Sequence, residues 1–75
     1  MATSLQLALG RTIKTLRKRA GLSQDALAAA AKVHRTYIPQ LESGRINPTV
    51  RSLEKVAKPL GLSAGELLLE AEKER

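Results

Sequence analysis

Apolar residues recur with helical spacing along nearly the whole chain, and no stretch alternates apolar and polar residues as a half-buried strand does. The spacing predicts five short helices. The first carries Leu9 to Ala20 and ends at Gly21, the second covers about 24–31 after the cap Ser23, and the third covers about 35–43 before Gly44. A fourth starts near Pro48 and Thr49 and reaches Leu60, and a fifth opens with the Ser63 to Glu66 capping-box spacing and frays over 70–75. The chain is therefore predicted to be all-α.

The chain length limits how many such helices can share a core. Seventy-five residues bury one modest interior, so residues 1–75 are predicted to form a single domain. No cysteine is present and there is one histidine, which leaves no disulfide, no thiolate metal site and no catalytic cluster. We expect no metal, no cofactor and no enzymatic activity.

The N-terminal stretch MATSLQLALGRTIK has no basic segment ahead of its apolar residues, and no window approaches the roughly 18 apolar residues that span a bilayer. We expect a soluble, cytoplasmic protein without membrane contact.

Positive charge is in excess. Thirteen Lys and Arg residues oppose seven Asp and Glu residues, which gives a formal net charge of +6 and a pI near 10.4. The cations dominate the first half of the chain, whereas glutamates dominate the end. This balance favours a polyanionic partner. We expect the basic first half of the chain to contact that partner and the acidic C-terminal end to point away from it. The alternative is that the charges simply solvate a small surface.

Three segments carry a family resemblance over roughly residues 9–69. They read LRKRAGLSQDALA, then VHRTYIPQLESGRINPTVRSLEKVA, then LGLSAGELL. Together they resemble the phage-repressor and Cro-like helix-turn-helix family, and most of all the compact controller proteins of restriction-modification systems. The resemblance implies a five-helix domain of the lambda-repressor-like type, with the helix-turn-helix in helices two and three, that regulates transcription by binding DNA.

A helix in the DNA major groove presents to the base edges only the short exposed side chains near its N-terminus. In the third helix, Ile38 and Leu41 belong to the core face. The base-reading residues are therefore predicted to be Arg35, Thr36, Pro39 and Gln40. Arg35 suits guanine, Gln40 suits adenine, and Thr36 offers a methyl or a hydroxyl group.

A second group is predicted to contact the DNA backbone and so to position the protein. The resemblance implies this for Gln24 at the start of helix two. Tyr37 is open between a hydroxyl contact to DNA and half-buried packing. The remaining members follow helix three in a polar stretch: Ser43, Arg45, Asn47, Thr49 and Arg51.

The resemblance also implies a buried ion pair between Arg17 and Glu42. Three residues depart from the family pattern. Pro39 is predicted to kink helix three without abolishing it, and Pro59 to bend helix four without ending it early. Lys32 replaces the glycine that is common in the turn, a change that costs about 1 kcal/mol if this residue is left-handed.

One such domain contacts too few base pairs to select an operator, so a symmetric dimer is expected. Surplus leucines in helix five, together with one just before it, indicate the dimer interface: Leu62, Leu67, Leu68 and Leu69. The expected partners are double-stranded DNA and a second copy, with RNA polymerase or a toxin as further partners. The alternative function is an antitoxin or a helix-turn-helix module that binds a protein partner.

Overall fold

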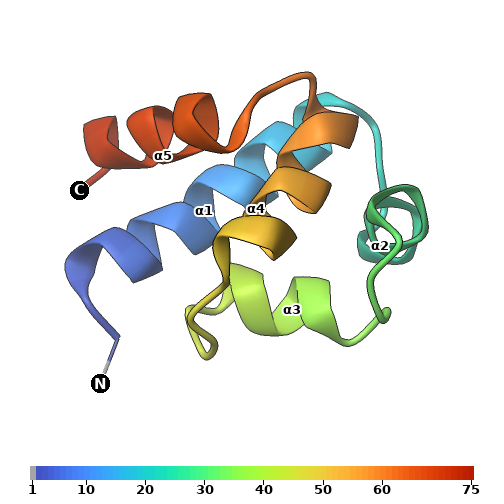
Figure 1. Ribbon diagram of the computed structural model, residues 1–75, viewed down its shortest axis with the longest axis horizontal. Coiled ribbons are helices and arrows are strands. Elements are labelled where there is room, and N and C mark those ends of the chain that lie inside the picture. The colour runs from blue at the N-terminus through green and yellow to red at the C-terminus, as the bar shows by residue number, and fades with distance from the viewer. Residues whose placement is uncertain (1) are drawn as a thin grey trace.

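The computed structural model describes residues 2–75 and shows helices joined by short turns (Figure 1). The elements are α1 (Ser4–Arg19), α2 (Gln24–Ala31), α3 (Tyr37–Glu42), α4 (Val50–Ala57), the 3-10 turn η1 (Lys58–Leu60) and α5 (Ala64–Lys73). The predicted all-α, five-helix fold is confirmed. None of the helices in residues 2–75 is long and apolar enough to cross a membrane.

Hydroxyl side chains begin four of the helices. Ser23 accepts a hydrogen bond from the main-chain N–H of Ala26, as predicted, and Ser63 and Glu66 form the predicted reciprocal capping box. Thr3 and Thr49 cap α1 and α4 in the same way. These caps satisfy main-chain donors that have no partner within the helix.

One apolar core joins all five helices. Its largest fully buried side chains are Ile13, Leu27, Ile38, Leu41, Val56 and Leu67. The long helix α1 runs through the middle of the domain, with α5 packed along one side of it and α3 on the other (Figure 1). The acidic α5 therefore lies at the opposite end of the molecule from α3.

The α3 helix is shorter than predicted, because it begins at Tyr37 and not near Arg35. Proline has no N–H and its ring clashes with the carbonyl four residues earlier, so Pro39 is best tolerated within a first turn. Residues 34–36 instead form a separate turn, in which the Tyr37 N–H donates to the carbonyl of His34. The helix continues through Pro39 to Glu42, which confirms that proline does not abolish it.

Two boundary predictions are wrong. Pro59 does end the α-helix early, since α4 stops at Ala57 and the chain tightens into η1. The segment 70–75 is not frayed: α5 continues to Lys73, Ala71 is fully buried, and the Arg75 guanidinium donates to the Ser4 hydroxyl oxygen at 2.9 Å.

Lys32 closes α2 in the left-handed conformation, with φ of 58° and ψ of 44°. The Val33 N–H returns to the Ala28 carbonyl at 3.0 Å, which completes a Schellman turn. The condition under which lysine costs more than glycine at this residue is therefore met.

Candidate nucleic-acid interface

The α3 segment has two distinct faces. Ile38 and Leu41 are buried in the core, whereas the four predicted base-reading residues are exposed: Arg35, Thr36, Pro39 and Gln40. Arg35 and Thr36 lie in the turn that precedes the regular helix. The structure thus presents these four side chains together on the outer surface of the helix-turn-helix.

His34 shapes the turn that leads into α3. Its Nδ1 atom accepts a hydrogen bond from the Thr36 N–H at 3.2 Å and lies 2.8 Å from the Thr36 hydroxyl oxygen. Thr36 itself provides no side-chain cap to α3. Because Nδ1 accepts from the Thr36 N–H, it is an acceptor toward the Thr36 hydroxyl as well, so the methyl group and the acceptor lone pairs of the hydroxyl oxygen remain for a base contact.

The predicted ion pair between Arg17 and Glu42 is confirmed. Arg17 Nε donates to Glu42 Oε2 at 2.6 Å and Nη2 donates to Oε1 at 3.2 Å, with 9% and 5% of the two side chains exposed. Arg17 Nη1 also donates to the Leu22 carbonyl at 2.8 Å. The pair therefore fixes the end of α3 against α1 and the turn before α2.

Gln24 joins this pair, because its Nε2 donates to Glu42 Oε1 at 3.1 Å. A carboxamide nitrogen carries two protons, so one remains for a phosphate oxygen. Because Arg17 neutralises Glu42, the carboxylate next to Gln24 does not repel a phosphate group at this position.

Tyr37 does not point to solvent as a backbone contact requires. It is half-buried, and its hydroxyl donates to Ser52 Oγ at 2.6 Å. A phosphate oxygen only accepts hydrogen bonds and the tyrosine has one proton, so the free protein adopts the packing alternative, and the DNA contact of Tyr37 stays a prediction that requires this bond to break. Thr49 is also engaged, since it exchanges main-chain and hydroxyl hydrogen bonds with Ser52 as the cap of α4.

The other predicted backbone contacts lie in the loop after α3 and in the first turn of α4, and all are exposed: Ser43, Arg45, Asn47 and Arg51. The Ser43 hydroxyl donates to the Gln40 carbonyl at 3.1 Å. Glycine is needed at residue 44, where φ is +75° and a Cβ atom would lie 2.6 Å from a methyl group of Leu7.

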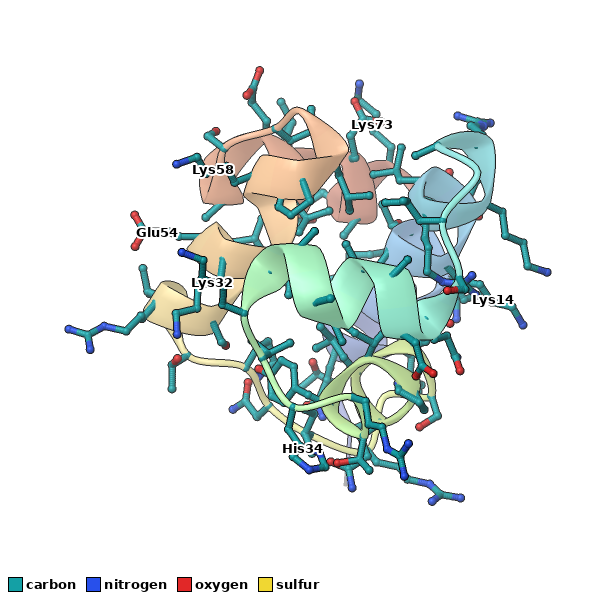
Figure 2. The ribbon with its side chains drawn as sticks, turned by 90° about the vertical axis from the view of Figure 1, so that its right-hand side faces the viewer. Lys14, Lys32, His34, Glu54, Lys58 and Lys73 are labelled. Atoms are coloured by element: carbon teal, nitrogen blue, oxygen red, sulfur yellow. The ribbon has the colours of Figure 1, made fainter. Side chains whose placement is uncertain are left out.

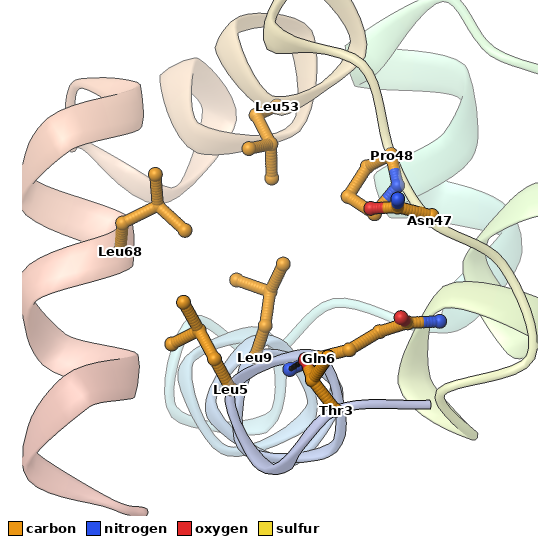
Figure 3. A pocket seen from close by; sticks show the side chains of 8 residues that line it. All are labelled: Thr3, Leu5, Gln6, Leu9, Asn47, Pro48, Leu53 and Leu68. Carbon is orange, nitrogen blue, oxygen red and sulfur yellow. Dashed lines mark hydrogen bonds between the residues drawn. The ribbon is translucent and has the colours of Figure 1, made fainter. Parts of the chain in front are cut away.

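Gln6 anchors this loop, and it is not among the residues predicted from the sequence. Its Nε2 donates to the main-chain oxygens of Gly44 and Ile46, each at 3.0 Å. In Figure 3 the Gln6 side chain reaches from α1 toward the loop that holds Asn47 and Pro48. No local pattern reveals such a contact, because its acceptors are main-chain atoms 38 and 40 residues away.

The leucines of the predicted dimer surface are divided between core and surface. Leu67 is fully buried in the core of its own chain, so the prediction that it contacts a partner is wrong. Leu62 and Leu68 are half-buried against the core, and Leu69 is 59% exposed. Three consecutive leucines cannot share one face of a helix, and the structure turns the third outward.

A short exposed helix, held by a buried ion pair and followed by an anchored polar loop, defines a helix-turn-helix protein. The chain belongs to the helix-turn-helix domain family, whose model matches residues 8–70.

Relatives cover nearly the whole chain. Control protein C.MunI from Mycoplasma sp is 37% identical over 71 residues, which span 93% of this chain and 96% of that protein. The clp gene regulator ClgR from C. glutamicum superposes with a TM-score of 0.86 at 31% identity, over 99% of this chain and 95% of that one. The restriction-modification controller protein C.AhdI from Aeromonas hydrophila gives 0.79 at 31% identity, over 83% and 94%.

Proposed function

We propose that this protein is a sequence-specific regulator of transcription that reads double-stranded DNA with α3 and the turn before it. The observation that carries the proposal is the two-faced helix: Ile38 and Leu41 are buried while the polar side chains opposite them are exposed. The net charge of +6 supplies attraction to the phosphates. The similarity to control proteins along almost their full length supports a single-domain cytoplasmic regulator of the restriction-modification controller type.

Arg35 is the residue with the largest expected role in sequence selection. Its guanidinium can donate two parallel hydrogen bonds to guanine O6 and N7. Replacing Arg35 by alanine is expected to weaken binding to the preferred site by about 1–3 kcal/mol, and to remove selectivity at one position of each half-site. Selection of sites from random duplex DNA, followed by titration of the winning site and of its single-base variants, measures both effects.

Arg51→Ala is the matched control, because Arg51 is exposed outside α3 and is expected to contact phosphate. It should weaken binding to all sequences alike and make the salt dependence shallower. Equal losses on all sites for both variants would show that Arg35 does not read a base.

Gln6→Ala tests whether the loop after α3 must be pre-ordered. The variant loses two hydrogen bonds, so the loop has to be ordered during binding, and DNA affinity is expected to fall by about 1–2 kcal/mol. Ser4→Ala is the control, because the Ser4 hydroxyl contacts Arg75 and not the loop. The idea fails if Gln6→Ala keeps wild-type affinity while its loop amides lose protection from hydrogen exchange.

We further infer that two copies associate about a two-fold axis through α5. Leu69 provides an exposed apolar side chain, and an apolar cavity of about 150 Å3 opens beside the neighbouring Leu68. Leu5, Leu9 and Leu53 complete much of its wall (Figure 3). An isologous contact would cover both features in both copies, with half-sites about 34 Å apart on DNA.

Leu69→Glu is expected to convert the dimer to a monomer, because it places a charge in an apolar contact. Sedimentation over a range of concentrations measures the change, and binding to a palindromic site should fall while binding to a single half-site stays constant. Val50→Glu, at another exposed apolar residue, is the control for sedimentation only, because Val50 lies between the predicted phosphate contacts Thr49 and Arg51. A Leu69→Glu protein that sediments as the wild type does would place the interface elsewhere.

A further inference from the structure

Three lysines surround a shallow cavity of about 370 Å3 where the end of α2 meets α4 and η1. Lys32, Lys55 and Lys58 supply the charge, and Ala30, Ala31 and Pro59 supply small apolar surface. We call these six residues the lysine pocket. Lys32 and Lys58 lie on one side of the domain, the side opposite Lys14 (Figure 2).

These lysines do not stabilise the fold through visible contacts. Within residues 2–75 the ion pairs are Arg17 with Glu42, Glu70 with Lys73 and Glu72 with Arg75, and none includes a lysine of the pocket. Glu54 is the carboxylate on α4 nearest to them in sequence, and it forms no ion pair either. Three positive charges therefore gather around the pocket, with one carboxylate, that of Glu54, on the same side of the domain and not in salt-bridge contact with them (Figure 2).

The backbone at Lys32 gives a second, independent observation. Gly21 and Gly44 adopt the same left-handed conformation after α1 and α3, where glycine carries no steric penalty. Lys32 adopts it with a full side chain, at a cost that the turn itself does not require. A non-glycine residue in the left-handed region, at the rim of a pocket, is the kind of backbone outlier that accompanies functional sites.

The lysine pocket extends away from α3. In Figure 2 His34, next to α3, lies at the lower end of the domain, Lys32 lies higher and Lys58 lies at the upper end. The pocket is also concave with an apolar floor, which a ridge of DNA phosphates would leave unfilled. A protein segment that carries carboxylates around one apolar side chain matches both the charge and the floor.

We propose that the lysine pocket docks an acidic segment of another protein, a function beyond DNA binding and compatible with it. The three lysines attract and orient the carboxylates of the partner segment. One apolar side chain of that segment packs on Pro59, Ala30 and Ala31 and forms the desolvated centre of the contact.

The test uses displayed libraries of short random peptides, selected on the purified full chain. The affinity of the selected peptides is then measured for three proteins: the wild type, a pocket variant and a matched variant. The pocket variant carries Lys32→Gln, Lys55→Gln and Lys58→Gln. The matched variant carries Lys14→Gln, Lys18→Gln and Lys73→Gln. Both variants lose the same charge from exposed positions. We expect acidic peptides with an apolar residue, bound at least about tenfold more weakly by the pocket variant than by the matched one.

Three results would overturn the proposal: no enrichment of acidic peptides, equal binding by both triple variants, or a pocket variant with weaker operator binding and a shallower salt dependence. The last result would make the pocket a DNA contact. A wild-type protein that selects peptides but no DNA site would contradict the proposed regulator function alone, so the two ideas fail separately.

Discussion

Replacing Arg17 by methionine is expected to lower the free energy of unfolding by about 3–5 kcal/mol. The substitution leaves the Glu42 carboxylate, 5% exposed, without its guanidinium, and leaves the Leu22 carbonyl without its donor at 2.8 Å. A domain of 75 residues has a total stability of about 4–11 kcal/mol, so the loss removes much of it. Urea denaturation followed by circular dichroism measures the change.

The double variant Arg17→Met, Glu42→Leu separates two contributions to the free energy of unfolding: the net contribution of the ion pair, and the cost of leaving one buried charge without its partner. Removing both charges together is expected to bring stability back to within about 1–2 kcal/mol of wild type. The exposed pair of Glu70 and Lys73 serves as a reference, since breaking it should cost less than about 1 kcal/mol. An Arg17→Met protein as stable as the wild type would mean that the buried carboxylate finds another partner or water.

Gly10→Ala is expected to destabilise the domain by about 3 kcal/mol, although alanine is the better helix former. A Cβ atom at residue 10 would lie 2.6 Å from the main-chain oxygen of Leu41 and similarly close to that of Glu42. These oxygens belong to the last turn of α3, so α1 and α3 would have to move apart. Thermal denaturation detects the effect as a fall in Tm of more than about 10 °C.

Gly65→Ala is the matched control within a helix. The nearest atom to an added Cβ there is Ser63 Oγ at 3.8 Å, so the methyl group fits. This variant should be stabilised by about 0.5–1 kcal/mol through helix propensity. Equal responses of the two glycines would show that the approach of α1 to α3 is not tight.

The sequence predicts most of the fold because its boundary signals are local. Ser23 and Ser63 precede apolar periodic stretches and cap α2 and α5 as expected. The lysine at residue 32, where the family commonly has glycine, closes α2 in the left-handed conformation. The buried Arg17 and Glu42 pair came from family resemblance, which encodes a contact between residues 25 apart.

The remaining site features depend on contacts that local patterns do not contain. The sequence does not show whether Tyr37 is exposed or packed. Its hydroxyl donates to Ser52 Oγ, a contact that depends on how α3 and α4 are placed in the fold. Leu67, Leu68 and Leu69 are indistinguishable until the rotation of α5 against α1 is known. The start of α3 was misplaced because the constraint of Pro39 acts on the residues before it.

The α3 helix is six residues long, and Thr36, the residue that precedes it, supplies no side-chain cap. A helix of this length is not stable alone in water, so α3 exists only while Ile38 and Leu41 remain in the core. Loss of tertiary structure and loss of operator recognition are therefore the same event. The concentration of active regulator therefore equals the concentration of folded domains, and a core mutation lowers it only when the loss of stability approaches the total free energy of unfolding.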